Sequence, residues 1–273
     1  MKKAIVQTDI APLYTGPNSM GELADEALYG MVVEITGEEQ NGLVPVLTHY
    51  NYTGFAPKSS LLAVENTEAE AWQAAAGQVV MAPYADAMAE PKVQAGRLAG
   101  LPRGAVVSLQ GPAQEGWVPV LLAGGQKAFM RASHLAPKAP HWQQAEEKVL
   151  RSALVQTALL YKGAAYRWGG KSPLGIDCSG LVSMAYMLCG CLIYRDAAIK
   201  PGFPIREIPK EVVKAGDLLF FPGHVAMAMG SGRYVHSTGF AGSDGVVVNS
   251  LIPGEPDYRP DLVEKITQAG SIF

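Results

Sequence analysis

Three features are scarce in this 273-residue chain, and each scarcity excludes a class of protein. Only three cysteines are present, two of them the close pair Cys189 and Cys191, so a disulfide framework is not expected. No segment approaches the roughly 18 consecutive apolar residues of a membrane-spanning helix. Neither sign of charge dominates, with 22 basic and 25 acidic residues and no Lys/Arg-rich run, which argues against nucleic acid as a partner.

The amino terminus, MKKAIVQTDIAP, also lacks the apolar stretch of about 7 to 15 residues that a secretory leader requires. Only Ala4, Ile5 and Val6 are consecutive apolar residues there. Reduced cysteines and the missing leader predict a cytoplasmic protein. A secreted or cell-wall-associated location stays open, because a chain whose leader had been removed would look the same.

Two segments of the first half align without a gap at an offset of 74 residues. GMVVEITGEEQNGLVPVL begins at Gly30, and GAVVSLQGPAQEGWVPVL begins at Gly104. Both contain short alternating β-branched stretches separated by glycine-containing turns, a pattern typical of small antiparallel barrels or sandwiches. We therefore expect two related β domains, at residues 1–65 and 76–137.

Two polar segments flank the second copy. Residues 65–78 (ENTEAEAWQAAAGQ) are polar and rich in alanine, and residues 136–147 (APKAPHWQQAEE) are interrupted by prolines. Both are interpreted as linkers.

The pattern changes after residue 140. Residues 145–163 (AEEKVLRSALVQTALLYKG) carry apolar side chains at roughly helical spacing, and a second helix is predicted after Asp177. From Asp217 onward, DLLFF, HVAMAM and YVHST are separated by Pro-Gly and Gly-Ser-Gly, which predicts an antiparallel meander. Helices followed by strands indicate an α+β domain, at residues 142–273.

Cys178 lies in the stretch GIDCSGL. A free cysteine on a helix is more often a buried structural residue than a nucleophile. Asp177 is a favourable N-cap, however, and it would place Cys178 in the first turn, where unpaired N–H groups and the helix dipole favour a thiolate. Cys189 and Cys191 follow at the far end of the same predicted helix and are interpreted as structural. No zinc or other metal site is expected.

A thiolate nucleophile needs a base and a group that orients the base. His224 begins HVAMAM, and His236 lies in YVHST. If residues 230–232 form a three-residue loop, Ala226 lies opposite His236, and the two histidines are diagonal neighbours roughly 5.5 to 8 Å apart at the backbone. A two-residue loop would place them on opposite faces. The remaining histidines lie in loop or linker segments and are weaker candidates: His49, His134 and His141.

Two stretches together resemble a known family. YRWGGKSPLGIDCSGLV (166–182), followed by GDLLFFPGHVAMAMGSGRYVHST (216–238), is similar to the NlpC-type papain-like cysteine peptidases, which cut bacterial cell-wall peptides. The resemblance implies an α+β, papain-like catalytic domain in which Cys178 is the nucleophile, His224 the general base and acid, and His236 the orienting group. It also implies the family's γ-D-glutamyl to diamino-acid cleavage, with no cofactor.

The two N-terminal copies resemble the two small bacterial SH3-like barrels that precede this domain in a subgroup of the family. By that resemblance Tyr166 matches an active-site tyrosine that binds substrate. Asp196, in LIYRDAAIK, matches a substrate-contacting acid, and Ala197 stands where a serine often follows it. Asp177 and Ser179 flank the nucleophile and are candidates both for capping the helix and for contacting the peptide.

In the same subgroup a glutamate and a tyrosine of the first SH3-like domain bind the free N-terminal amine of the peptide. Tyr52, in NYTGFAP, is the best match for the tyrosine, because the second copy reads GQKAFMR. Glu22 is the match for the glutamate, with Glu34 as a rival. Packing within the barrel for Tyr52 and a solvated position for Glu22 are the alternatives. A peptide whose L-Ala is still joined to the glycan could not present this ammonium to a carboxylate.

The expected function is therefore a peptidase that releases L-Ala-D-Glu from free stem peptides, L-Ala-γ-D-Glu-diamino acid, in murein recycling. Three alternatives stay open: a hydrolase of intact peptidoglycan anchored by the SH3-like pair, a non-catalytic cell-wall-binding protein, and an amidase or acyltransferase on a similar scaffold. The sequence does not distinguish diaminopimelate from lysine in the substrate and gives no oligomeric state.

Overall fold

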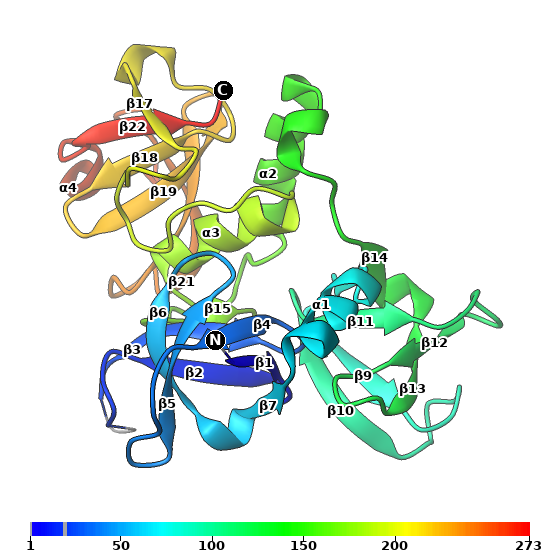
Figure 1. The fold of residues 1–273 in the computed structure, drawn as a ribbon. Coiled ribbons are helices and arrows are strands. Elements are labelled where there is room, and N and C mark those ends of the chain that lie inside the picture. Colours follow the sequence, from blue (N-terminus) through cyan, green and yellow to red (C-terminus); the bar gives the residue numbers. More distant parts are fainter. Residues whose placement is uncertain (1, 19–20) are drawn as a thin grey trace. The chain divides into compact units, whose positions relative to one another are not determined.

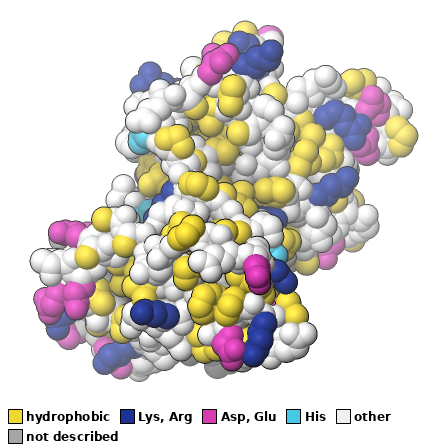
Figure 2. Space-filling view, turned by 90° about the vertical axis from the view of Figure 1, so that its right-hand side faces the viewer, with side chains coloured by type: hydrophobic (Ala, Val, Ile, Leu, Met, Phe, Trp, Pro, Cys, Tyr) yellow, Lys and Arg dark blue, Asp and Glu magenta, His cyan; other side chains and the backbone are white. Residues whose placement is uncertain are grey.

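A computed structural model describes residues 2–18 and 21–273. The chain divides into two compact units, residues 1–138 and 139–273 (Figure 1). On the face drawn in Figure 2, basic and acidic side chains are interspersed, in keeping with a formal net charge of −3. No helix of the described residues has the length and apolar character needed to cross a membrane.

The first half of unit 1 is a seven-stranded antiparallel sheet. Its strand order is β3-β2-β6-β5-β4-β1-β7. Among the described residues the outermost strands, β3 and β7, are not paired with each other, so the sheet is open. The strands are β1 (Lys2–Val6), β2 (Ile10–Tyr14), β3 (Leu23–Leu28), β4 (Val32–Ile35), β5 (Leu43–Thr48), β6 (Thr53–Pro57) and β7 (Leu61–Val64).

The second half of unit 1 repeats this sheet. Its strand order, β10-β9-β13-β12-β11-β8-β14, is the first order with seven added to each label. The internal repeat seen in the sequence is thus a repeat of structure, but both copies are open sheets and the expected closed barrels are a correction. The strands are β8 (Gln78–Val80), β9 (Tyr84–Met88), β10 (Arg97–Pro102), β11 (Val106–Leu109), β12 (Trp117–Leu121), β13 (Lys127–Arg131) and β14 (Leu135–Pro137).

The polar segment that joins the two copies is a helix rather than an irregular linker. Helix α1 (Asn66–Ala75) begins with a capping box in which the Glu65 and Glu68 side chains bond each other's backbone N–H groups. Trp72 is buried, and its indole Nε1 donates to the carbonyl of Gly30 at 2.8 Å. Because α1 contacts both β1 and β11, one amphipathic helix fastens the two sheets together.

Two residues at the junction explain why the copies form a single unit. Tyr29, from the first copy, belongs to the apolar core of the second, and its hydroxyl accepts a hydrogen bond from the N–H of Ala123. Gly30 follows with φ +78°, and a Cβ there would lie 2.4 Å from the carbonyl oxygen of Val106. Only glycine fits both that backbone conformation and that approach.

Unit 2 is an α+β domain, as the helix-then-strand pattern predicts. Its six-stranded antiparallel sheet has the order β17-β22-β18-β19-β20-β21, and α3 packs against α2, β19 and β20 (Figure 1). The elements are α2 (Glu147–Leu159), the short pair β15 (Lys171–Ser172) and β16 (Gly175–Ile176), α3 (Cys178–Leu188), β17 (Arg206–Ile208), β18 (Leu218–Phe221), β19 (His224–Gly230), β20 (Arg233–Thr238), β21 (Gly245–Ser250), α4 (Pro260–Val263) and β22 (Gln268–Ser271).

The domain boundaries at 1–65, 76–137 and 142–273 stay a prediction. The predicted helix after Asp177 and the predicted meander are confirmed as α3 and β18–β20.

Candidate active site

Cys178 is the first residue of α3, and its thiol faces backbone donors. Asp177 caps the helix with extended backbone, and its Oδ1 accepts a hydrogen bond from the N–H of Gly180. The thiol interacts with the backbone N–H groups of Ser179 and of Val225, the second residue of β19. The amino end of the helix thus holds the sulfur next to the start of the strand that His224 begins.

Arg195 fixes this end of the helix through charged hydrogen bonds. Its guanidinium donates to both carboxylate oxygens of Asp177, each at 3.0 Å, and to the hydroxyl of Ser179 at 2.7 Å. Arg195 is 1% exposed, so this is a buried bidentate ion pair. Asp177 also accepts from the N–H of Gly169 at 2.8 Å, which ties the preceding loop to the helix. The pair fixes where the first turn of α3 begins.

The hairpin between β19 and β20 brings the two histidines together. Gly230 pairs with Arg233 across a two-residue loop of Ser231 and Gly232, both with positive φ. The loop therefore has two residues, the alternative that was expected to place the histidines on opposite faces. A register shift between Ala228 and Gly230 adds one residue to β19, so Met227 pairs with Val235 and the expected register of Ala226 opposite His236 holds nevertheless. A bulge, which alternation alone does not reveal, keeps His224 and His236 on one face.

A chain of hydrogen bonds runs from His224 away from the cysteine. His224 Nε2 lies 2.8 Å from His236 Nδ1, and His236 Nε2 lies 2.9 Å from Asn249 Oδ1. The Asn249 Nδ2 group donates to the carbonyl of Asp257 at 2.7 Å, which identifies the other amide atom as the oxygen. Asn249 was not among the predicted site residues.

These bonds fix the proton on each ring. Since Asn249 Oδ1 only accepts, His236 must donate from Nε2, and its Nδ1 is then an acceptor. His224 in turn donates from Nε2 to that acceptor, which leaves its Nδ1 with a lone pair. Nδ1 of His224 is therefore the nitrogen that can take a proton, and the imidazolium formed would keep its bond to His236.

Burial dominates the titration of all three groups. It raises the pKa of Cys178 to about 11, and the nearby Asp177 carboxylate adds to that rise. Burial also lowers the pKa of His224 to about 3 and that of His236 to about 4, with further lowering of the His224 pKa by the charge on His236. The expected thiolate at the helix end is thus a correction: Cys178 rests as a thiol and His224 as a neutral imidazole.

Tyr166 and Asp196 lie on the same unit as the cysteine. Tyr166 is half-buried, and burial together with the charges of Cys178 and Asp177 raises its pKa to about 12, so its phenol stays protonated beside the thiol. Burial raises the pKa of Tyr194, and a hydrogen bond that joins its side chain to Asp196 raises it further. Ala197, the next residue after Asp196, has no hydroxyl.

Comparison with known proteins decides the family. A model described as the NlpC/P60 family matches residues 163–253. A protein named dipeptidyl-peptidase 6, from Lysinibacillus sphaericus, is 45% identical over 277 residues, which cover 99% of each chain. The chain belongs to the NlpC/P60 family. It is a cysteine peptidase, and the predicted family and enzyme class are confirmed.

Two further relatives support this assignment. A γ-D-glutamyl-L-lysine dipeptidyl-peptidase from Bacillus subtilis (strain 168) is 33% identical over 134 residues, 45% of this chain and 42% of that one. A crystal structure of an NlpC/P60 family protein from Bacillus cereus ATCC 10987 has a TM-score of 0.78, 23% identity and 98% coverage of both chains, and shows the shared fold.

Asp177 and Ser179 are interior residues in this NlpC/P60 peptidase. They are 6% and 7% exposed, and the bonds that their side chains make run to Arg195, to each other and to nearby backbone N–H groups. These bonds account for the cap and the ion pair. Contact of either side chain with a peptide stays a prediction.

Tyr52 and Glu22 lie in unit 1, and each is described there by itself. Tyr52 is half-buried at the turn before β6, where its N–H donates to Thr48 Oγ1 at 3.0 Å. Glu22 is exposed just before β3, and its rival Glu34 is half-buried on β4. A neighbouring pair is fully internal, because the Tyr50 hydroxyl donates to the buried Asp25 at 2.6 Å. Their amine-binding roles stay predictions.

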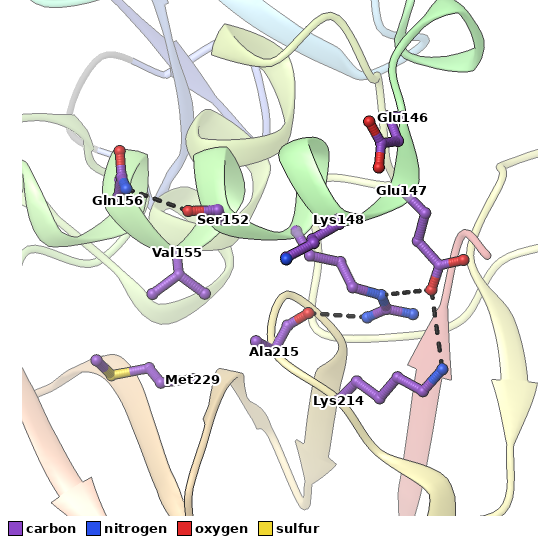
Figure 3. Close-up of a pocket in the computed structure, with 10 residues that line it drawn as sticks. Glu146, Glu147, Lys148, Ser152, Val155, Gln156, Lys214, Ala215 and Met229 are labelled. Atoms are coloured by element: carbon purple, nitrogen blue, oxygen red, sulfur yellow. Dashed lines mark hydrogen bonds and ion pairs between the residues drawn. The ribbon is translucent and has the colours of Figure 1, made fainter.

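A hollow of about 680 Å³ on unit 2 contains none of the predicted site residues. Glu147 pairs there with Arg151 and with Lys214, and Figure 3 marks the contact between Glu147 and Lys214 with a dashed line. Arg151 also donates to the carbonyl of Ala215 and to the buried Asp217. This network ties α2 to the start of β18 and is structural.

Proposed function

We propose that this NlpC/P60 peptidase hydrolyses the γ-D-glutamyl to diamino-acid bond of free stem peptides and releases L-Ala-D-Glu. The observation that carries the proposal is the hydrogen-bond chain from His224 through His236 to Asn249, which begins one residue from the backbone N–H that faces the Cys178 thiol. The names of the relatives, dipeptidyl-peptidase 6 and γ-D-glutamyl-L-lysine dipeptidyl-peptidase, support the bond and the product.

In the first step the Cys178 proton passes to Nδ1 of His224 as the sulfur attacks the γ-carbonyl of D-Glu. The imidazolium formed keeps its Nε2–H bond to His236, which is held in the accepting tautomer by Asn249. His224 then donates the same proton to the leaving amine of the diamino acid, and a thioester to D-Glu remains.

In the second step water replaces the amine. His224 takes one proton from that water as it attacks the thioester carbonyl, and returns it to the cysteine sulfur as the dipeptide leaves. The protonated phenol of Tyr166, beside Cys178, is a donor available to the carbonyl oxygen in both steps. Each proton taken from a nucleophile is thus given to a leaving group.

Substrate selection is the finer part of the proposal. We propose that Asp196, bonded to Tyr194, contacts the peptide, and that Tyr52 and Glu22 receive its free N-terminal ammonium. The internal repeat supports the amine-binding role of Tyr52, since the turn that contains this tyrosine occurs in the first copy alone. A dipeptidyl-peptidase releases the first two residues of a peptide with a free amino terminus. A site that binds the ammonium group would select such peptides. Murein recycling and a cytoplasmic location belong to the same proposal.

The experiment uses two peptides and mass spectrometry. Purified protein is incubated with L-Ala-γ-D-Glu-diaminopimelate and with its N-acetylated form, and both are repeated with lysine as the diamino acid. Release of L-Ala-D-Glu from the free peptides alone supports the proposal. Cleavage of both forms would favour a hydrolase of intact peptidoglycan, and cleavage of neither would contradict the assigned bond.

A further inference from the structure

The second copy of the repeat contains a pocket of about 630 Å³, within the size range of small-ligand sites. It lies over β9, β12, β13 and the turn that follows β13. Its aromatic and polar lining residues are Tyr84, Asp86, Trp117, Arg131, Ser133 and His134, and its apolar ones include Met88 and Val93.

The first copy provides an internal control for this pocket. Strands β2 and β9, and strands β6 and β13, correspond at the offset of 74, and in both copies the bridge between them joins matching positions, Tyr14 to Phe55 and Met88 to Phe129. The core of the fold is therefore common to both copies, so a lining residue needed for folding should recur.

Apart from Ser133, which Ser59 matches, the polar and aromatic lining residues do not recur. At the matching positions the first copy has Leu43 for Trp117, Pro57 for Arg131 and Ser60 for His134. It also has Ile10 for Tyr84 and Pro12 for Asp86. Since the first sheet folds without any of these side chains, the fold does not require them in the second.

Arg131 is the cation of the pocket. Its guanidinium lies 4.3 Å from the centre of the Trp117 ring, and among the described residues it has no ion-pair partner. Gly116 lies beside it with φ +80°, and a Cβ there would be in ordinary contact with Arg131 Nη1, at 3.6 Å. A half-buried guanidinium that lies over an indole and lines a pocket keeps N–H donors that are available to an anion.

Two further observations bear on the ligand. His134 Nδ1 is buried and has no hydrogen-bond partner among the described residues, so a ligand group could satisfy it. Asp86 pairs only loosely with Arg97, at 3.6 Å with both side chains more than half exposed, and is available to an ammonium group. Because Arg131 covers a face of Trp117, that face cannot stack on a sugar ring.

We propose that this pocket binds an acidic peptide, with a carboxylate on Arg131 and the apolar part of the peptide on Met88 and Val93. The pocket holds one free cation and one acid, which suits a peptide with both charges better than a phosphate dianion. The choice of the murein stem peptide as probe rests on the proposed function, but the site uses residues of the second copy only.

The test is an NMR titration of the full chain carrying Cys178→Ala, labelled with ¹⁵N in its tryptophans. The Trp117 indole signal is assigned with Trp117→Phe, and the probe is L-Ala-γ-D-Glu-L-Lys, added up to its solubility limit. We expect a saturable shift of this signal. Arg131→Gln should weaken the binding by about 10- to 100-fold, as loss of a charged hydrogen bond predicts, and so should amidation of the peptide carboxylates.

Lys127→Gln is the matched control, because it removes an exposed cation from the same strand outside the pocket and should leave the affinity unchanged. The first copy carries proline at the position of Arg131, so the fold tolerates loss of this cation. Absence of a shift, equal binding by Arg131→Gln, or a shift caused instead by N-acetylglucosamine oligomers would overturn the proposal.

Failure of this site and failure of the proposed function are distinguishable. If the active enzyme cleaves the tripeptide but the Trp117 signal does not shift, only the proposed peptide site is contradicted. If the signal shifts in a way that depends on Arg131 but no cleavage occurs, the proposed function is contradicted and the peptide site is supported.

Discussion

The two ends of helix α3 carry cysteines with opposite surroundings. At the amino end the Cys178 thiol faces two backbone N–H groups and lies beside the strand that begins with His224. At the carboxyl end Cys189 contacts the hydroxyl of Thr157 at 3.5 Å, and Cys191 is fully buried. Three cysteines, one that begins α3 and two that follow its last residue, are thus one candidate nucleophile and two packing residues.

Thiol acidity does not make the difference. Burial raises the pKa of Cys178 to about 11 and that of Cys191 to about 12, so neither is a thiolate at neutral pH. What distinguishes Cys178 is a base held in one tautomer and oriented by two further side chains. In this molecule a neutral imidazole of fixed tautomer, one residue from the backbone N–H that faces the thiol, distinguishes the candidate nucleophile, and a lowered thiol pKa does not.

Replacement of single cysteines should give the largest effect on catalytic activity. Cys178→Ala is expected to lower kcat by at least about 10⁴-fold, because no other group can form the thioester. Cys189→Ala is the matched control and should retain activity within about twofold, since its sulfur contacts Thr157 only as packing. Steady-state kinetics with the free tripeptide measures both. An equal loss of kcat in the two variants would contradict different roles for Cys178 and Cys189.

Replacement of Arg195 should give the largest loss of stability among these variants. Arg195→Met leaves the Asp177 charge buried without its partner and is expected to lower the free energy of unfolding by about 3–5 kcal/mol. Arg206→Met, on exposed β17, should change it by less than about 0.5 kcal/mol. Urea denaturation measures both.

The double variant Asp177→Asn/Arg195→Met sharpens this result. It keeps a good N-cap without the unpaired charge and should be more stable than Arg195→Met alone. If the double variant is no more stable, the ion pair is not what holds the amino end of α3.

Replacement of Asn249 should have an intermediate effect on catalysis. Asn249→Ala removes the acceptor that fixes the His236 tautomer and is expected to lower kcat by about 10- to 100-fold with little change in KM. Asn249→Asp keeps the acceptor and should recover activity. A merely structural role would instead lower the unfolding temperature and leave the kcat of the folded fraction unchanged.

The pH dependence should show the smallest but most specific effect. Lowered pKa values of His224 and His236, about 3 and 4, keep the base neutral, so kcat/KM should fall only below the ordinary histidine pKa of about 6.5. Asn249→Asp places a negative charge beside His236 and should move this acid limb to higher pH. A wild-type limb at or above pH 6.5 would contradict the buried neutral pair.

Much of the site follows from the sequence, and the reasons for the remainder are physical. The motif and the N-cap located Cys178, whereas strand alternation placed both histidines on one face only on the condition of a three-residue loop. The bulge at Met229 was not predictable, because a hairpin loop of two or three residues gives the same local pattern. Asn249 was missed because it is one polar residue in a β-branched strand, and its pairing with His236 depends on strand order.

Other errors came from context that composition does not contain. Residues 65–78 are polar enough for a linker, yet two buried positions, Ala69 and Trp72, suffice to dock α1 on its neighbours. The helix-end rule predicted a thiolate, but burial outweighs two backbone donors. Closure of a sheet into a barrel likewise depends on pairing of its outer strands, which alternation does not specify.

The measurement that tests the central claim most directly is site-specific modification of the active enzyme. An L-Ala-γ-D-Glu chloromethyl ketone, which alkylates a cysteine held against the γ-carbonyl position, is added in increments while activity and peptide mass maps are recorded. We expect one equivalent on Cys178, with activity lost in proportion. Activity that survives complete modification of Cys178, or is lost with modification of Cys189 or Cys191 instead, would contradict the account.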